Sequence, residues 1–184
     1  MSPAPLLMSC DDYFTKTPET VKPAELAFGV LRVSESPTAR HQSAVLRLLL
    51  TLDAHVRARD IGQMWVAPLD VVLDRERALI VQPDLFFVSN NRAWIVGDRV
   101  DGPPDLVIEV LSPTPRIGRT EEHVKWFAEY RVRECWLVRQ NQRSLSVIDF
   151  ADGRIARRRE FTRKAAIESS VLPGFTLSLD DILD

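Results

Sequence analysis

The stretch PPDLVIEVLSP, residues 103–113, constrains the fold more than any other part of the sequence. Its alternating apolar residues predict a buried strand, and period-two spacing puts Glu109 on the face opposite Ile108. A carboxylate inside such a strand is costly unless another group pairs with it or a metal ion coordinates it. Glu109 is therefore the first candidate site residue, whereas Asp105 is expected to terminate the strand.

The composition predicts an ordinary soluble protein of one domain, residues 1–184, with an irregular N-terminal segment at 1–23. The 184 residues are 45% hydrophobic and 27% charged, enough for a sizeable core. The formal net charge of -2 gives no general attraction to nucleic acid or to an anionic membrane. Cys10 and Cys135 have no ligand spacing, which argues against a disulfide framework and a zinc motif. Neither a signal peptide nor a membrane span is recognisable, so we expect a cytoplasmic protein.

Apolar periodicity and turn residues predict an α/β (α+β) fold in which helices flank a mixed β-sheet. Residues 25–35 resemble a hairpin or a bent strand around Gly29, and a helix capped by Ser36 or Thr38 follows, with apolar spacing as far as Val56. A second helix is expected from Thr120, as its N-cap, to about Tyr130. The expected strands cover 64–74, 79–89, 105–112, 134–140, 145–150 and 154–161, and the tail at 171–183 is expected to form a closing strand and a short helical end.

Asp84, in VQPDLFFV, is a second acid inside an apolar run. If the two acid-bearing strands are neighbours, the carboxylates of Asp84 and Glu109 come close to each other. Like charges at short distance raise a pKa or recruit a divalent cation, and oxygen ligands suit Mg²⁺ or Mn²⁺. Such an ion can polarise a phosphodiester oxygen and activate a water molecule. The alternatives are a turn-forming aspartate and a salt-bridged glutamate, and spacing alone leaves them open.

Five segments follow one another in an order that resembles a known family: a hairpin similar to EGVL, then SPTARHQ, VQPDLFFVS, GPPDLVIEVLSP and WFAEYRVRECWLV. Together they look like the Uma-two family of restriction endonucleases, within the PD-(D/E)xK nuclease superfamily. The resemblance runs from about Glu25 to the C-terminal LPGFTLSLDDIL. It implies a restriction-endonuclease-like core with a central mixed sheet. It also implies a Mg²⁺- or Mn²⁺-dependent DNA endonuclease and, by analogy with enzymes that cut both strands, a homodimer.

The resemblance also assigns roles to individual residues. Asp84 matches the metal-binding aspartate of the PD motif, and Glu109 matches the glutamate of the (D/E)xK element. The carbonyl of Val110 would add a metal ligand. His41 matches a histidine common at the start of the first helix, where it would line the cleft. Glu25 aligns with an acid in the N-terminal hairpin, as a weaker match.

The catalytic lysine is missing from both expected positions. The superfamily places it two residues after the glutamate, where it orients the attacking water and stabilises charge, but Leu111 stands there. The Uma-two family typically has its lysine on the following helix, at the position of His123. Lys125, the other candidate, lies roughly 200° around the helix from His123 and is expected to pair with Glu129. Three functions stay open: an endonuclease that uses His123, a catalytically impaired module that binds nucleic acid or a protein partner, and a purely structural homo-oligomer.

Two groups of basic residues can contact phosphates. Arg116 and Arg119 flank the entry to the second helix, close in sequence to Glu109. The second group, near the C-terminus, has an equally good alternative as the charged, solvated edge of a sheet. It consists of Arg157, Arg158, Arg159, Arg163 and Lys164.

Overall fold

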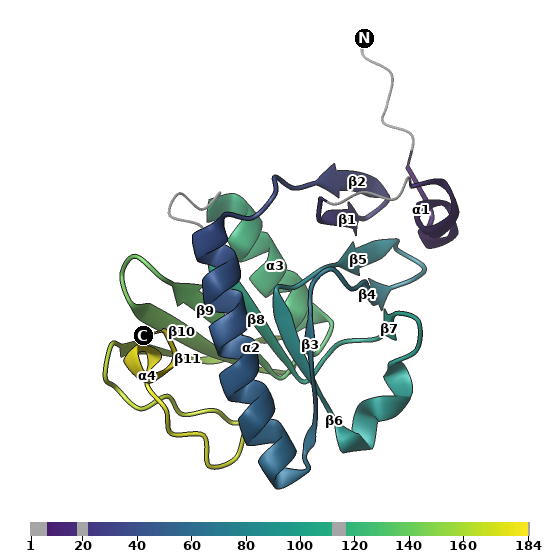
Figure 1. Cartoon of the computed structure of the whole chain (residues 1–184). Helices are drawn as coiled ribbons and strands as arrows, with labels where there is room; N and C mark the ends of the chain where they lie inside the picture. The colour runs from purple at the N-terminus through teal and green to yellow at the C-terminus, as the bar shows by residue number, and fades with distance from the viewer. Residues whose placement is uncertain (1–6, 18–21, 112–116, 184) are drawn as a thin grey trace.

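The computed structural model describes residues 7–17, 22–111 and 117–183. It contains two mixed β-sheets, and the larger one lies between helices α2 and α3 (Figure 1). This six-stranded sheet has the order β11-β10-β9-β8-β6-β3, with β8 and β9 parallel and the other neighbours antiparallel. Its strands are β3 (Gly62–Val66), β6 (Leu85–Ser89), β8 (Leu106–Leu111), β9 (Glu134–Arg139), β10 (Ser144–Ala151) and β11 (Arg154–Thr162). The predicted mixed α/β fold is confirmed.

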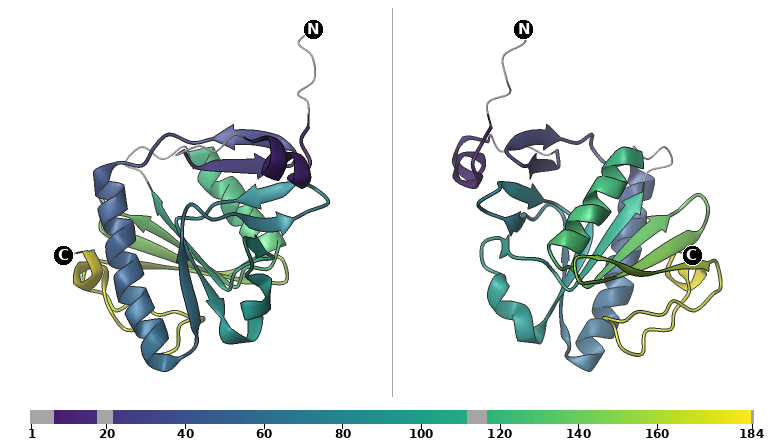
Figure 2. Two further views of the ribbon diagram at one scale, coloured as in Figure 1. Left: turned by 45° about the vertical axis from the view of Figure 1, so that its right-hand side comes forward. Right: turned by 180° about the vertical axis from the view of Figure 1, so that it is seen from behind.

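The smaller sheet has the order β2-β1-β5-β4-β7. Its first two strands form the expected hairpin, which reaches towards α3 (Figure 2). Nη1 of Arg32 in this hairpin donates a hydrogen bond to Glu122 of α3 at 2.6 Å, which ties the smaller sheet to the helix that covers the larger one, next to the site described below. The strands are β1 (Ala24–Ala27), β2 (Val30–Val33), β4 (Val71–Asp74), β5 (Leu79–Val81) and β7 (Val100–Asp101).

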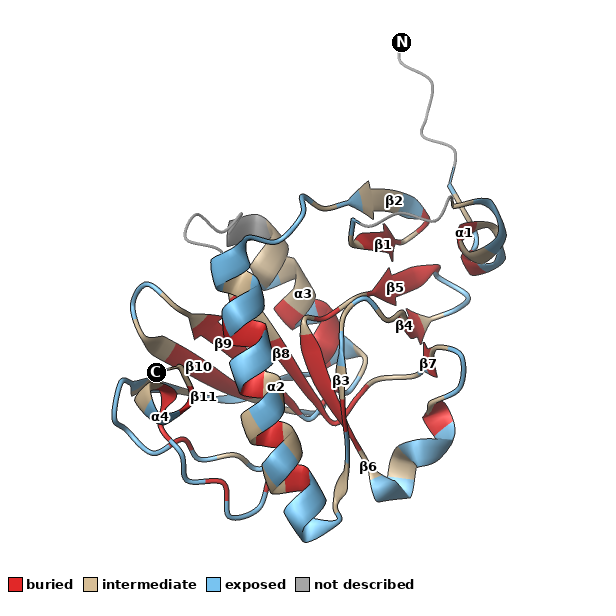
Figure 3. Cartoon of the chain, viewed as in Figure 1, coloured by how far each residue is buried: buried red, intermediate tan, exposed pale blue. Residues whose placement is uncertain are grey.

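Helices α2 (Ala39–Arg59) and α3 (Ile117–Glu129) cover opposite faces of the six-stranded sheet. Leu48 of α2 packs in one core with Ile108, and Phe127 of α3 packs in another with Val107. Strand β8 is therefore covered on both faces, as its alternation predicts, and Figure 3 shows the strands between the two helices as buried. The other helices are α1 (Cys10–Lys16), the 3-10 helix η1 (Asn90–Ile95) and α4 (Leu179–Leu183). No helix in the described ranges is both long and apolar enough to cross a membrane.

The start of α2 is set by its cap. The Oγ1 of Thr38 accepts a hydrogen bond from the backbone N–H of His41 at 3.2 Å, which satisfies one of the free N–H groups at the helix start. Apolar residues then recur at helical spacing, and Leu48, Leu52 and Val56 are fully buried. Thr38 is thus the cap, one of the two candidates predicted, and it fixes His41 in the first turn.

Two expected strands are each divided between the two sheets. The segment 64–74 belongs to β3 and β4, and the segment 79–89 belongs to β5 and β6. Pro68 and Pro83 lie in the gaps, where a strand cannot continue its ladder because proline has no N–H. The prediction of single strands was wrong. The chain passes from one sheet to the other at each proline, and Asp84 lies immediately after the second passage.

Two predicted boundaries also fail. Helix α3 begins at Ile117, so Thr120 lies inside the helix and is not its N-cap. The expected closing strand in 171–183 is absent from those described residues, although α4 confirms the helical end. This part of the chain is fixed by side chains instead of a ladder, because the hydroxyls of Ser169 and Ser170 donate hydrogen bonds to the buried Glu134 at 2.6 and 2.7 Å.

Candidate active site

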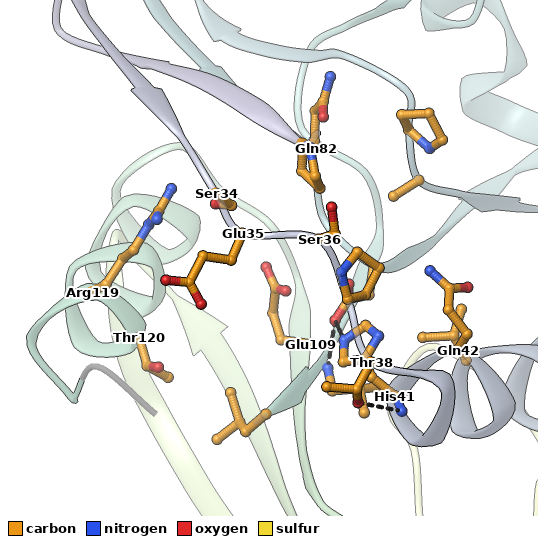
Figure 4. A pocket seen from close by; sticks show the side chains of 18 of the residues that line it. Ser34, Glu35, Ser36, Thr38, His41, Gln42, Gln82, Glu109, Arg119 and Thr120 are labelled. Carbon is orange, nitrogen blue, oxygen red and sulfur yellow. Dashed lines mark hydrogen bonds and ion pairs between the residues drawn. The ribbon is translucent and has the colours of Figure 1, made fainter. Parts of the chain in front are cut away.

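The two strand-borne acids are neighbours in the six-stranded sheet. Strands β6 and β8 pair antiparallel with Leu85 opposite Ile108. At the next position along the two strands, Asp84 therefore lies opposite Glu109. Both line one pocket of about 800 Å³. Its walls come from the β1–β2 hairpin, residues 33–38, the first turns of α2 and α3, and the turn after β9 (Figure 4). The expected meeting of the two acid-bearing strands is confirmed.

Asp84 is held by groups from β8 and from α2. Its Oδ2 accepts a hydrogen bond from the backbone N–H of Val110 at 2.8 Å and lies 3.1 Å from Nε2 of His41. The hydrogen bond to Asp84 raises the pKa of His41. The other ring nitrogen, Nδ1, is buried and has no hydrogen-bond partner among the described residues. His41 therefore lines the pocket, as the resemblance implies, in direct contact with the candidate metal-binding aspartate.

Glu109 lies between Asp84 and a histidine of α3. Its side chain is 18% exposed, and Nδ1 of His123 is 3.6 Å from its Oε1. Burial raises the pKa of Glu109, the contact with His123 lowers it, and the negative charge of Asp84 raises it again. The resulting pKa is above that of an ordinary glutamate, chiefly because of burial, and the nearby Asp84 carboxylate adds to the effect.

Glu25, the weaker match, belongs to the same group of side chains. It comes from β1 of the smaller sheet, and its side chain is 7% exposed. Its Oε2 lies 2.6 Å from Nη2 of Arg119 and 3.2 Å from Nε2 of His123. Burial raises the pKa of Glu25, but the two cations on α3 outweigh this effect and lower the pKa to about 2. A buried, ionised carboxylate from one sheet is thus neutralised by the helix that covers the other.

His123 lies between the two glutamates. Burial lowers its pKa, but the contacts with Glu109 and Glu25 raise it to about 10. The imidazole also packs on two aromatic side chains of α3, with ring centroids 5.2 Å from Trp126 and 5.9 Å from Phe127. These contacts fix the orientation of the ring. The site therefore holds an imidazolium beside Glu109, at the helix position where the Uma-two resemblance expects a lysine.

The other positions considered for the lysine do not provide a cation to the pocket. Leu111 packs against the apolar core under α3. Lys125 is exposed and lies outside the pocket lining. Its expected partner, Glu129, instead accepts a hydrogen bond from Nη1 of Arg77 at 2.9 Å. The helical geometry that separates Lys125 from His123 is thus confirmed. Within the described residues, the expected pair of Lys125 with Glu129 is not formed, because Glu129 binds an arginine instead.

The described members of the two groups of basic residues expected to contact phosphates lie in different places relative to the pocket. Arg116 lies outside the described residues, and Arg119 lines the pocket with its Nη2 bound to Glu25. The second basic group lies on and just after β11, which is an edge strand of the six-stranded sheet. Within it, Nη2 of Arg159 is 2.9 Å from Asp149. This placement favours the alternative of a charged, solvated sheet edge.

The sequence does not single out most of the uncharged polar residues of the pocket. They come from segments far apart in the chain, which no local pattern connects. The signals that the sequence does offer are the position of Gln82 beside the PD motif, the place of Gln42 next to His41, and the cap positions considered for Ser36 and Thr120. These residues are Ser34, Ser36, Gln42, Gln82, Thr120, Gln140 and Asn141, several of which are labelled in Figure 4.

The donor atoms at Asp84 and Glu109 suit a hard divalent cation. Two carboxylates and the carbonyl of Val110 are oxygen ligands of the kind that Mg²⁺ and Mn²⁺ prefer, usually together with water. No group of three or more His, Cys, Asp or Glu side chains able to hold a metal ion is found within the described residues. A cation here would therefore depend on these two carboxylates, the carbonyl, and oxygens of water or substrate.

The mixed sheet brings two neighbouring acids to one pocket, as the resemblance to the restriction-endonuclease-like class of nucleases implies. Residues 11–180 match the model of the Uma2 (Uma-two) family, described as "Putative restriction endonuclease", and the chain belongs to this family. Among solved structures, it is similar to "a putative nuclease belonging to DUF820 from Anabaena variabilis ATCC 29413". The two chains are 18% identical with a TM-score of 0.78, over 94% of this chain and 96% of that chain, which shows a common fold. No curated protein matches the sequence.

Proposed function

We propose that this chain is a divalent-metal-dependent DNA endonuclease that hydrolyses phosphodiester bonds. The observation that carries the proposal is the pairing of β6 with β8, which places Asp84 and Glu109 in one pocket beside His123. Membership of a restriction endonuclease family supports a nuclease that acts on DNA. Asp84, Glu109 and the carbonyl of Val110 would hold Mg²⁺ or Mn²⁺.

A bound divalent cation supplies polarisation of a phosphodiester oxygen and a lower pKa for bound water. The residues of the chain have separate tasks around it. The N–H of Val110 and the ring of His41 fix the Asp84 carboxylate. His123 presents a positive charge next to Glu109, where it can stabilise negative charge that develops on the phosphate, the task of the lysine in the wider superfamily. Glu25 holds His123 from the other side.

A second function, binding of nucleic acid or a protein partner without cleavage, is favoured by one specific observation. The carboxylates of the pocket already have partners within the chain, the ring of His41 on Asp84 and that of His123 on Glu109. A metal ion must compete with these contacts. Leu111 adds no lysine that could take part in cleavage.

Metal titration combined with DNA cleavage separates the two functions. The wild type is expected to cut DNA in Mg²⁺ or Mn²⁺, and Asp84→Asn or Glu109→Gln is expected to lose activity by about a hundredfold or more. Glu76→Gln, at an exposed turn, is the matched control and should retain activity. If no DNA is cut but Mn²⁺ still raises the melting temperature, and Glu109→Gln abolishes that rise, the binding module is the better description. Absence of both cleavage and a metal effect contradicts the enzyme.

The homodimer stays a prediction by analogy with enzymes that cut both DNA strands. Light scattering during gel filtration of the purified chain tests it. A mass twice that of one chain is expected. The mass of a single chain over the whole concentration range would contradict it.

A further inference from the structure

The pocket around the two acids is walled on several sides. Residues 33–38 run along it from β2 to α2, opposite the start of α3 with Arg119 and Thr120 (Figure 4). The turn after β9 forms a further wall. At its centre, the side chains of Asp84 and Glu109 are only 23% and 18% exposed. A phosphate must pass between these walls to reach them. In a duplex each phosphate is fixed to the outside of a stiff double helix, whereas an unpaired strand can bend into such a pocket.

The charge of the pocket is unlike that of a surface that follows duplex DNA. Proteins that bind duplex commonly neutralise about 6–10 phosphates with lysine and arginine side chains. Acidic and basic side chains nearly balance along this lining, and one of the cations, Arg119, is bound to Glu25. Contacts other than phosphate neutralisation must therefore supply much of the affinity. The charged lining residues other than histidine are Lys22, Arg40, Arg119, Glu25, Glu35, Asp84 and Glu109.

Exposed apolar side chains stand at the same pocket. Val33 at the end of β2 is 54% exposed, and Val66 at the end of β3 is 39% exposed, and both line it. Uncharged hydrogen-bonding groups lie among them, with Ser34, Ser36 and Gln42 visible in Figure 4. Unpaired bases have apolar faces and free hydrogen-bonding edges that match these two kinds of group. In a duplex the same faces are stacked and the Watson–Crick edges are paired.

We propose that the site binds an unpaired strand of DNA, such as a single strand or an overhang, in preference to intact duplex. A phosphodiester would lie at Asp84 and Glu109, and neighbouring bases would contact Val33 and Val66. The inference rests on the proposed function for the cleavage step, whereas the binding preference follows from the walls, the charge and the apolar rim of the pocket.

Binding and cleavage are measured separately on one labelled sequence, as a single strand and as a blunt duplex. Fluorescence anisotropy in Ca²⁺, at one fixed salt concentration, is expected to show about tenfold or greater preference of the wild type for the single strand. Equal or tighter binding of the duplex, or no binding of the single strand, overturns the inference whether or not DNA is cut. Preferential binding of the single strand without cleavage in Mg²⁺ or Mn²⁺ supports the inference and contradicts the endonuclease.

A matched pair of variants tests the place of binding. Val33→Asp puts a negative charge at the rim and should weaken single-strand binding by about tenfold. Val30→Asp lies on the same strand of the hairpin at 38% exposure but outside the pocket lining, and it should leave binding unchanged. Unaltered melting temperatures show that both variants are folded. Equal weakening by both variants, or weakening by neither, overturns the assignment of the strand to this pocket.

Discussion

Replacement of His123 by glutamine should destabilise the fold even without metal or substrate. The histidine nitrogens lie 3.6 Å from Glu109 and 3.2 Å from Glu25, and the three side chains are 12%, 18% and 7% exposed. At an effective dielectric constant of about 20, each contact has an attraction of about 5 kcal/mol, which desolvation partly offsets. Removal of one partner from a buried ion pair costs about 3–5 kcal/mol because the other charge is left uncompensated. For a chain of this size, the melting temperature should fall by about 6–20 °C.

A double-mutant cycle in EDTA at neutral pH distinguishes this charge effect from simple loss of packing. His123→Gln combined with Glu109→Gln should lose less stability than the sum of the two single losses, because both single changes remove the same contact between the two side chains. His55→Gln is the control, since His55 contacts the carbonyl of Pro173 and no carboxylate is among its described partners. Wild-type stability of His123→Gln refutes the reasoning. So does a double variant whose loss equals the sum of the two single losses.

The difference in stability between wild type and His123→Gln should depend on pH, because the fold raises the pKa of His123. Burial lowers the pKa of His123, but the two glutamates outweigh it and raise the pKa to about 10. The stabilisation by the protonated ring should therefore be complete below about pH 6.5, the ordinary histidine value, and disappear as the pH rises through about 10. Urea unfolding of wild type and His123→Gln across this range measures it. A difference in unfolding free energy that does not change with pH contradicts it.

Two further predictions concern the framework of the site. Glu134 is fully buried and accepts hydrogen bonds from a tryptophan and two serines, so Glu134→Ala should lower the unfolding free energy by about 3 kcal/mol or more. The exposed Glu168→Ala should change it by less than about 0.5 kcal/mol, and equal losses in urea unfolding contradict the role of Glu134. A Cβ at Gly62 would overlap the carbonyl oxygen of Val88 on the neighbouring strand, so Gly62→Ala should cost at least about 1–3 kcal/mol. Gly97→Ala, where the nearest atom is 3.9 Å away, is its control, and similar melting temperatures for the two variants count against the packing argument.

Local patterns in the sequence are sufficient for the central part of the site. Alternation along residues 106–111 predicts both faces of β8, because each face packs against a different helix. The cap at Thr38 likewise predicts where α2 begins, and hence that His41 lies in its first turn. The neighbouring position of Asp84 follows once its segment is recognised as the next strand of the sheet.

What local patterns miss depends on contacts between distant segments. The apolar runs at 64–74 and 79–89 have the same composition whether they form one strand or two, and only the passage between sheets at each proline divides them. The importance of Glu25 is hidden for a related reason. Its position in a short hairpin carries no sign that the smaller sheet reaches α3, where Arg119 and His123 meet it.

The role of Glu25 explains how histidine can stand in for lysine. A lysine keeps its charge at neutral pH without help, but an ordinary imidazole is mostly neutral there, and burial makes its charged form less favourable still. His123 is a cation in this site because carboxylates from both sheets contact it. Glu25→Gln should therefore lower the pKa of the His123 ring, measured by an NMR titration that needs no enzymatic activity. In a His123→Lys background, the same Glu25→Gln change should affect cleavage less than it does in the wild type. An unchanged His123 pKa, or equal losses of cleavage in the two backgrounds, would show that Glu25 does not maintain the cation.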